Sequence, residues 1–344
     1  MLLDPLTLPA SIDTPDALDA LLARPTQALM DDLAAVDGDL LILGVGGKMG
    51  PSLARLARAA SGKRIVAVAR FTDAALRPAL ERDGIETIAC DLLDEAALRA
   101  LPQMANVVFM AGHKFGASGD PALTWAMNVH MPALVAQVFP RARIAAFSTG
   151  CVYPFVPVSS GGCTEDAAPD PPGEYAVTCL GRERMFEYFS RRLGTPGRLI
   201  RLNYAIDLRY GVLHDIARKV RDGTPLDVTM GHVNVIWQGD ACAQALRALR
   251  HCTAPTTPLN VTGPGTLSVR TLAHELGRRL SRTPVLAGTE AETCWLNDAA
   301  EAARLFGPPV VTLPRMLDWV AGWVAQDQPS LNKPTRFEVR SGVY

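Results

Sequence analysis

The sequence has no long apolar run and no marked excess of charge of either sign. Its longest apolar stretches, residues 40–45 and 107–111, are far shorter than the roughly 20 residues that span a bilayer. The charges of its 34 basic and 35 acidic residues nearly cancel, which argues against a basic surface that binds nucleic acid or an anionic membrane. Residues 1–9 lack the basic flank and apolar stretch of a secretory signal. We therefore expect a cytoplasmic protein that binds neither nucleic acid nor membrane.

The sequence also lacks the cysteine spacing of a metal site or a disulfide framework. Its seven cysteines are an odd number, form no Cys-x-x-Cys pair and have no histidine at a spacing suited to zinc. Reduced thiols and no bound metal are therefore expected. With 344 residues, 48% of them apolar, the chain is long enough for one large nucleotide-binding domain and a smaller partner.

What the sequence does contain, from residue 39 onward, is an alternation of short apolar runs with amphipathic stretches. The runs predict strands at residues 40–43, 65–68, 85–89, 107–110, 144–147 and 199–202. The stretches between them predict helices at residues 51–60, 95–100, 121–138 and 175–192. Strands that are apolar on both faces and alternate with helices predict a doubly wound parallel sheet, an α/β fold of the Rossmann type.

This pattern divides the chain into four segments. Residues 1–37 are expected to form a helical extension, in which Thr14 caps a first helix. Residues 38–204 are expected to be the nucleotide-binding domain. Residues 205–327 predict a smaller mixed α/β C-terminal lobe, mainly for substrate, with some elements returning to the core. Residues 328–344 are expected to be a C-terminal tail.

A glycine-rich turn joins the first predicted strand of the sheet to the helix that follows it. Glycines in such a turn let the backbone approach a pyrophosphate, and the helix N-terminus offers unpaired N–H groups and a positive dipole end. We therefore expect NAD(P) to bind at this turn. The residues concerned are Gly44, Gly46, Gly47, Lys48, Met49 and Gly50.

The spacing Gly44-x-x-Gly47-x-x-Gly50 resembles that of the extended short-chain dehydrogenase/reductases, the epimerase/dehydratase group. The resemblance continues over roughly residues 39–325. It implies further cofactor contacts after the third and fourth strands and on two later helices. These contacts fall on Asp91, Leu92, Ala111, Gly112, Asn128 and Cys179.

The residues after the second strand bear on the choice of cofactor. An acid there usually holds the adenosine ribose hydroxyls, but this chain has Ala69-Arg70-Phe71. Arg70 can bind a 2′-phosphate, which favours NADP over NAD. In the alternative interpretation Arg70 faces solvent and Asp73 contacts the ribose.

Two further segments carry the catalytic part of the resemblance. Residues 147–154 are similar to the family's Ser-rich stretch ending in Val-Tyr-Gly, which implies that Thr149 is the catalytic hydroxyl. Tyr175 matches the acid/base tyrosine of the family's Tyr-x-x-x-Lys helix, and Glu183 matches a downstream acid. The lysine position, however, holds Cys179, which supplies neither a positive charge nor a strong donor.

Three accounts of this departure stay open. In the first, another cation takes the place of the lysine, with Lys114 and Arg182 as candidates. In the second, the chemistry relies on other groups, such as Tyr153, His113 or the Cys179 thiol. In the third, the chain binds NAD(P) without turnover, as a sensor or regulatory protein. A phenol with an ordinary pKa of about 10 is almost wholly neutral at pH 7, so oxidation of an alcohol suffers more than reduction of a carbonyl.

The resemblance also implies a substrate side. Asn203 matches the substrate-contacting residue of the family's Arg-x-x-Asn segment. Further side chains expected to face the cleft are His113, Lys114, Tyr153, Arg209, Tyr210 and His232. Polar loop residues of this kind suit a carbohydrate. We therefore expect an NAD(P)-dependent oxidoreductase or epimerase/dehydratase acting on a sugar, sugar acid or nucleotide-sugar, with a homodimer as the candidate assembly.

Overall fold

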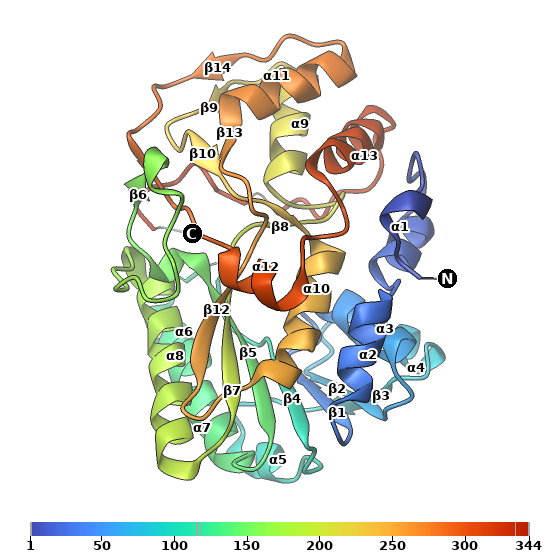
Figure 1. The fold of residues 1–344 in the computed structure, drawn as a ribbon, viewed down its shortest axis with the longest axis vertical. Helices are drawn as coiled ribbons and strands as arrows, with labels where there is room; N and C mark the ends of the chain where they lie inside the picture. Colours follow the sequence, from blue (N-terminus) through green and yellow to red (C-terminus); the bar gives the residue numbers. More distant parts are fainter. Residues whose placement is uncertain (1, 115, 118, 334, 343–344) are drawn as a thin grey trace.

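The computed structural model describes residues 2–114, 116–117, 119–333 and 335–342. A parallel sheet flanked by helices fills the lower half of the view in Figure 1, and a smaller lobe of helices and short strands lies above it. Among the described residues, seven strands form the sheet, and all six neighbouring pairs run parallel. The prediction of a doubly wound, Rossmann-type α/β fold is thus confirmed.

The order of strands in the sheet determines where a ligand can bind. In spatial order the strands are β12 (Thr257–Val261), β7 (Gly197–Leu202), β5 (Arg143–Thr149), β4 (Asn106–Phe109), β1 (Leu40–Leu43), β2 (Ile65–Ala69) and β3 (Glu86–Ala89). The chain proceeds outward from β1 to β3 on one side, then continues from β4 to β12 on the other. This reversal between β1 and β4 is the point where open α/β sheets bind their ligands, beyond the carboxyl ends of the strands.

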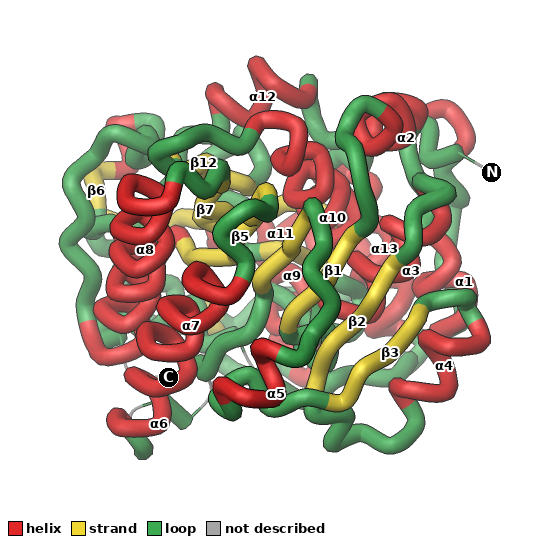
Figure 2. The backbone as a smooth tube through the Cα atoms, turned by 90° about the horizontal axis from the view of Figure 1, so that it is seen from below, coloured by secondary structure: helices red, strands yellow, loops and turns green. Residues whose placement is uncertain are grey.

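Helices cover both faces of the sheet (Figure 2). Leu40 and Ile42 of β1 face one core, formed with α2 (Gln27–Ala34), α3 (Gly50–Ala60) and α10 (Gln238–Arg247). Leu41 and Leu43 face the other. That second core is formed with α5 (Glu95–Arg99), α7 (Met131–Val138) and α8 (Gly173–Leu193). Successive side chains of a strand point to opposite faces, so a strand between two cores must be apolar throughout.

The remaining helices lie at the edges of the sheet or in the smaller lobe. They are α1 (Pro15–Leu22), α4 (Leu76–Arg82), α6 (Pro121–Trp125), α9 (Val212–Asp222), α11 (Val269–Leu280), α12 (Ala300–Phe306) and α13 (Leu313–Ala325). A π-helical turn, Ala126–His130, joins α6 to α7. Thr14 caps α1 as predicted, since its hydroxyl accepts a hydrogen bond from the Ala17 N–H at 3.2 Å.

Short strands complete the smaller lobe. They are β6 (Val156–Pro157), β8 (Ala205–Ile206), β9 (Leu226–Asp227), β10 (His232–Val233), β11 (Ile236–Trp237), β13 (Leu267–Ser268), β14 (Leu286–Ala287) and β15 (Thr293–Cys294). The lobe has its own core, in which Trp237 and Trp319 meet edge to face with ring centroids 5.3 Å apart. None of the described helices is long and apolar enough to cross a membrane.

The C-terminal tail packs onto the smaller lobe. Phe337 is buried in the core of that lobe, and Glu338 pairs with Lys219 of α9 at 3.2 Å. Further along, Arg340 donates to the carbonyl oxygen of Thr293 at 2.6 Å. The tail therefore crosses from α9 to β15, and the backbone of Gly342 lies against Gly173 at the start of α8.

Candidate active site

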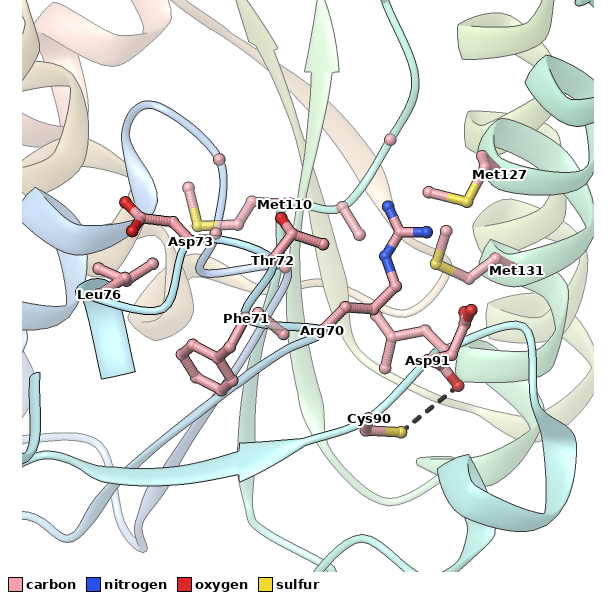
Figure 3. Close-up of a pocket in the computed structure, with 17 residues that line it drawn as sticks. Arg70, Phe71, Thr72, Asp73, Leu76, Cys90, Asp91, Met110, Met127 and Met131 are labelled. Carbon is pink, nitrogen blue, oxygen red and sulfur yellow. Dashed lines mark hydrogen bonds between the residues drawn. The ribbon is translucent and has the colours of Figure 1, made fainter. Parts of the chain in front are cut away.

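A first cavity, of about 250 Å³, opens at the switch point of the sheet (Figure 3). It is lined by the glycine-rich turn after β1, the loops after β2 and β3, and the start of the loop after β4. Eight of the predicted cofactor residues lie in its wall: Gly44, Gly46, Gly47, Arg70, Asp91, Leu92, Ala111 and Gly112. A cavity at these strand ends has the position that is expected for a nucleotide-binding site in an open α/β sheet.

The glycines of the turn are needed for two different structural reasons. Gly44 has φ +93° and packs against Ala111, and a Cβ at Gly50 would collide with the Val45 carbonyl group. These two glycines shape the turn itself. Gly46 and Gly47 are exposed, and a Cβ on Gly47 would have only the Gly44 oxygen, at 3.6 Å, as a close neighbour. The middle of the turn therefore leaves open the space through which a pyrophosphate can approach, and the residues fit a dinucleotide.

The loop after β2 presents both groups that we weighed for cofactor choice. Arg70 lines the first cavity, and Figure 3 shows its side chain extending toward Met127 and Met131. Asp73 also lines the cavity, but its carboxylate already accepts a hydrogen bond from the Ala75 N–H at 2.9 Å. Asp91 similarly accepts from the Leu93 N–H at 3.0 Å. Arg70 is thus the cationic side chain offered by this loop to a phosphate.

A second cavity, of about 270 Å³, shares Gly47 and Met110 with the first and continues toward the smaller lobe. It brings together eight of the predicted site residues, from six separate segments of the chain: Gly47, Lys48, Met49, Lys114, Thr149, Tyr175, Asn203 and Tyr210. Its further lining includes residues of the smaller lobe and Thr335 of the tail. The two cavities thus adjoin at the glycine-rich turn and the end of β4, the second lying toward the smaller lobe.

Tyr175 stands in the second cavity with Cys179 one turn further along α8. The two side chains are hydrogen-bonded to each other, and Cys179 is fully buried. Burial raises the pKa of Tyr175 well above its ordinary value, and the neighbouring thiols of Cys179 and Cys151 add to the shift. Tyr175 is therefore a neutral phenol at physiological pH, able to donate a proton.

Two cations lie near this tyrosine, as the first account of the missing lysine requires. The Lys114 ammonium is 5.4 Å from the centroid of the Tyr175 ring. The charge of Arg182 lowers the pKa of Tyr175, against the larger effect of burial. Arg182 is itself buried, and it donates to the Phe147 carbonyl and to Asn128 Oδ1, both at 2.8 Å. Arg182 thus acts from within the protein, while Lys114 borders the cavity.

Thr149 ends β5 at the wall of the second cavity. Its oxygen accepts a hydrogen bond from the Cys151 N–H at 3.2 Å, which opens the short 3-10 helix Gly150–Val152. Its hydroxyl hydrogen can then be donated to a substrate oxygen. Ser148, beside it, instead donates to Glu183 Oε1 at 2.6 Å.

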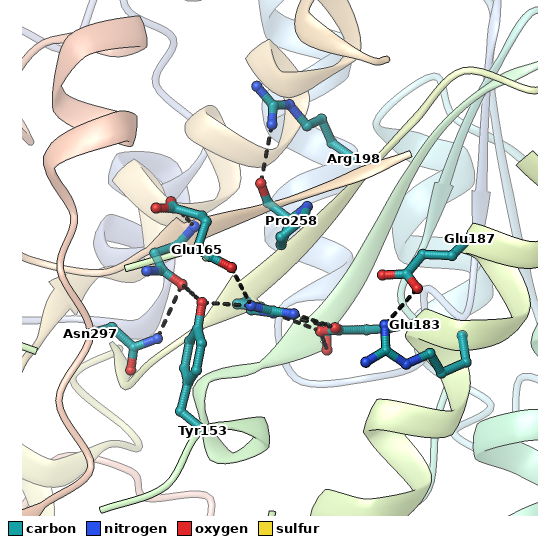
Figure 4. Close-up of polar contacts among 11 residues, drawn as sticks. Tyr153, Glu165, Glu183, Glu187, Arg198, Pro258 and Asn297 are labelled. Carbon is teal, nitrogen blue, oxygen red and sulfur yellow. Dashed lines mark hydrogen bonds and ion pairs between the residues drawn. The ribbon is translucent and has the colours of Figure 1, made fainter. Parts of the chain in front are cut away.

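Glu183, Arg201 and Tyr153 form a buried network that reaches the cavity wall at Ser148. Figure 4 labels Tyr153 and Glu183 among these polar contacts. Arg201 and Glu183 form an ion pair at 2.7 Å, with 3% and 0% of their side chains exposed. Arg201 also donates to the Tyr153 hydroxyl at 2.6 Å, and that hydroxyl donates to Asn260 Oδ1 at 2.9 Å. Burial raises the pKa of Tyr153 to about 12. The network ties β7 to α8 and to β12.

Several residues that we expected at the site lie outside both cavities. Tyr153 belongs to the buried network just described. Arg209 binds Asp207 and Asp19, each at 2.9 Å, and His232 is in β10. The His113 N–H donates to Asn128 Oδ1 at 2.8 Å, and Asn128 Nδ2 donates to the His113 carbonyl oxygen at 2.9 Å. This pair of hydrogen bonds fixes the loop that carries Lys114.

The second cavity also contains residues that the sequence did not single out. They are Met110, Phe147, Ser148, Cys151, Leu202, Tyr204, Ala205, Gly211, Val212, Gln238 and Thr335. Tyr204 directly follows the predicted Asn203, so proximity along the chain was an available signal. Thr335 had none, because its place depends on the path of the tail.

Comparisons with known proteins agree with this fold. A UDP-glucuronic acid 4-epimerase from Bacillus cereus, solved with UDP-glucuronic acid and NAD, has a TM-score of 0.70 and 17% identity, covering 84% of this chain and 99% of that one. A dTDP-glucose 4,6-dehydratase from Streptomyces venezuelae, with NAD bound, has a TM-score of 0.73 and 18% identity, covering 84% and 97%. A UDP-glucose 4-epimerase from Thermotoga maritima, solved with UDP-glucose, has a TM-score of 0.69 and 16% identity, covering 84% of this chain and 99% of that one.

These likenesses, at low identity, show that the chain has the fold of these proteins. No protein-family model and no curated protein matches the sequence.

Proposed function

We propose that this chain is an NAD(P)-dependent enzyme, an oxidoreductase or epimerase/dehydratase, that acts on a sugar, sugar acid or nucleotide-sugar. The observation that carries the proposal is that the two cavities adjoin at Gly47 and Met110, because this places Tyr175 and Thr149 next to the cavity that lies where such sheets bind a nucleotide. The likeness to solved sugar-nucleotide epimerases and dehydratases supports the same class of reaction.

The residues divide the chemistry between them. A nicotinamide bound here supplies hydride transfer at its C4. Tyr175 moves the proton to or from the substrate oxygen, and Thr149 orients that oxygen by a hydrogen bond. Lys114 supplies positive charge beside the phenol, in place of the lysine that Cys179 replaces. Because burial keeps Tyr175 protonated, the site favours the half-reaction that reduces a carbonyl.

The division of the chain follows from the same proposal. Residues 38–204 hold the cofactor, and residues 205–327 supply most of the substrate side, together with the tail. For the cofactor we propose a preference for NADP, because the loop after β2 offers Arg70 and no carboxylate at position 69. Asp91 and Leu92, which the family resemblance gives as cofactor contacts, line the same cavity.

A pair of variants on α8 tests the proposal. Tyr175→Phe removes the proton donor but leaves the cavity's shape, so turnover should fall about a hundredfold or more while cofactor affinity is unchanged. Tyr188→Phe is the matched control, because Tyr188 is 52% exposed on the same helix. Turnover by Tyr175→Phe at the rate of Tyr188→Phe would contradict the assigned role.

A further inference from the structure

A row of three buried asparagines leads from the core of the protein to the second cavity. Asn260 lies in β12, Asn297 lies in the segment between β15 and α12, and Asn203 follows the end of β7. Their exposed fractions are 0%, 2% and 5%, and of the three only Asn203 lines the cavity. A side-chain amide has a donating NH₂ end and an accepting oxygen end. The direction of each amide in the row therefore decides what Asn203 offers to a ligand.

The direction of the Asn260 amide is fixed by its neighbours. Asn260 Nδ2 donates to the carbonyl oxygens of Cys163 and Asp298, both at 2.9 Å. Because a carbonyl oxygen can only accept, this end must be the NH₂ group, and Oδ1 points the other way. Oδ1 accepts from the Tyr153 hydroxyl at 2.9 Å and from Asn297 Nδ2 at 3.3 Å, and Figure 4 shows both residues at this point of the network. The innermost amide of the row thus has one orientation.

The orientation of Asn260 determines that of Asn297 and, through it, that of Asn203. Because Asn297 Nδ2 faces Asn260, Asn297 Oδ1 faces Asn203, and it accepts a hydrogen bond from Asn203 Nδ2 at 2.9 Å. The Asn297 backbone is held as well, since its N–H donates to Asn234 Oδ1 at 3.0 Å. Asn203 Nδ2 also donates to the Trp295 carbonyl oxygen at 3.5 Å. Both acceptors hold the NH₂ group of Asn203 toward the protein, so its Oδ1 is turned away from them.

Asn203 therefore offers an oxygen to the cavity. Its Oδ1 has no hydrogen-bond donor among the described residues, and it is not one of the unpartnered polar atoms that are sealed in the core. A buried acceptor of this kind needs a donor, which is water in the free protein and a ligand group in the complex. The hydroxyl groups of a sugar are donors of the required kind.

The row of asparagines reaches the cavity beside Thr149. Leu202, the residue before Asn203, pairs with Thr149 across neighbouring strands of the sheet. A Cβ on Gly150 would lie 2.7 Å from Asn297 Oδ1 and 3.1 Å from Asn203 Cβ. The contact between the two asparagines thus lies against the residue that follows Thr149. The ligand group that donates to Asn203 would therefore belong to the part of the substrate near the Thr149 hydroxyl.

We propose that Asn297 is a positioning residue of this site, which holds Asn203 Oδ1 toward the cavity so that it accepts a hydrogen bond from one free hydroxyl of the substrate. The inference rests on the proposed function, because it takes the substrate to be a sugar bound beside Thr149. The two polar groups then have opposite tasks, since Thr149 donates to one substrate oxygen and Asn203 accepts from another. The site therefore discriminates against a sugar that has no hydrogen to donate at that position.

Calorimetric titration of the parent protein, saturated with whichever of NAD and NADP it binds more tightly, tests whether the site requires a donor. Glucose, glucuronate, UDP-glucose and UDP-glucuronate are titrated first. The tightest of them is then compared with its monodeoxy and monodeoxyfluoro derivatives. At one ring position both replacements should weaken binding about tenfold or more, and fluorine should be no better than hydrogen, because fluorine cannot donate.

Two variants of Asn297 separate positioning from stability. Asn297→Leu frees the Asn203 amide to turn, so the preference for the hydroxyl over the fluoro derivative should shrink to about threefold or less. Asn297→Asp keeps an oxygen that accepts from Asn203 Nδ2, so it should retain the preference although a buried carboxylate lowers the melting temperature. If Asn297→Leu does not fold, Asn297→Ser replaces it, because the serine hydroxyl is too short to take the place of Oδ1.

Asn106→Leu is the matched control. Asn106 is also a buried asparagine, 1% exposed, but it begins β4 and so lies at the edge of the sheet opposite the cavities. Its Nδ2 donates to backbone carbonyl oxygens, among them that of Asp37 at 2.9 Å. The substitution should lower the melting temperature and leave the preference for the hydroxyl unchanged.

Two results would overturn the proposal. One is a parent protein that binds the fluoro derivative as tightly as the hydroxyl form at every ring position, because the site would then require no donor. The other is an undiminished preference in the folded Asn297→Leu or Asn297→Ser protein, because Asn297 would then be only structural. A parent protein that binds no NAD(P), or none of the four sugars, contradicts the proposed function itself, and this inference with it, before any variant is made.

Discussion

The Cys179 thiol is hydrogen-bonded to the phenol of Tyr175, at the position where the sequence resemblance predicts a lysine. Burial raises the pKa of both groups, and Cys179 itself supplies no positive charge; the positive charge that α8 does bring near them is that of the buried Arg182. The positive charge that faces the ring on the cavity side comes from Lys114, on a different segment of the chain. This relationship leads to the first prediction.

Cys179→Lys is expected to lower turnover rather than to improve it. Cys179 is 0% exposed and packs against Val152, Tyr153 and Cys163, so a lysine there would bring a charge into a core that already contains Arg182. Either the new ammonium loses its proton or the packing shifts. Lys114→Ala in the parent protein should also lower turnover. The measurement is a pH–rate profile in the oxidative direction for all three proteins. A clear gain in oxidative rate by Cys179→Lys at neutral pH would contradict the account in which Lys114 replaces the lysine.

Gly47→Val is expected to abolish cofactor binding and leave the fold intact. The added side chain would project into the space shared by the two cavities, and a Cβ there meets only the Gly44 oxygen at 3.6 Å. The free energy of unfolding should change by less than about 1 kcal/mol. Gly50→Val is the contrasting control, because its Cβ would collide with the Val45 carbonyl and lower the melting temperature. Normal cofactor affinity in Gly47→Val would mean that the glycines only form a tight turn.

Arg70→Leu should remove a preference for NADP. Arg70 lines the first cavity, and its guanidinium can bind a 2′-phosphate with two parallel hydrogen bonds. We expect the NADP affinity to fall about tenfold or more and the NAD affinity to stay within about twofold. Titration of both cofactors into both proteins measures this, and a parent protein with equal affinity for the two, or with tighter NAD binding, contradicts the prediction.

Tyr153→Phe should lower stability without changing substrate affinity. Its hydroxyl sits between Arg201 and Asn260 in the buried network, and removal leaves both partners short of a hydrogen bond. The expected loss is about 1–3 kcal/mol in the free energy of unfolding. Chemical denaturation gives the free energy of unfolding, and steady-state kinetics give the KM for the sugar, each for the parent protein and for Tyr153→Phe. A raised KM at unchanged stability would return Tyr153 to the substrate side, where the family resemblance puts it.

The fold was predictable because its signal is local and repeated. Each predicted sheet strand is present within a few residues of its expected bounds. The signal is strongest in β1 and β2, which are buried and apolar at every position, and weaker in the edge strand β3, which is partly exposed. The helices α2, α4 and α12 were missed, because they are short and have only one narrow buried face. The strand β12 lies in the C-terminal half of the chain, pairs with β7 and so extends the main sheet.

The site was predictable where the chain itself brings residues together. The glycine-rich turn and the ends of β2, β3 and β4 converge because parallel strands end at one edge of a sheet. Contacts between distant segments could not be read in this way. Thr335 reaches the cavity through the path of the tail, and the Tyr153 hydroxyl is turned away by Arg201 and Asn260. Side-chain direction in an irregular segment depends on partners that no local pattern records.

The central claim is that this site carries out redox chemistry on a sugar with bound NAD(P). The most direct measurement follows the near-ultraviolet absorbance of reduced nicotinamide in the cofactor-loaded protein as sugars, sugar acids, sugar phosphates and nucleotide-sugars are added one at a time. The account predicts that at least one sugar-type ligand is converted, with a lasting change in the redox state of the cofactor if the enzyme is an oxidoreductase and a transient one if the hydride returns to the sugar, and that Tyr175→Phe binds the same cofactor without converting the ligand. Cofactor that binds tightly and keeps its redox state, with every ligand recovered unchanged, would contradict the account and would indicate a nucleotide-binding protein without turnover.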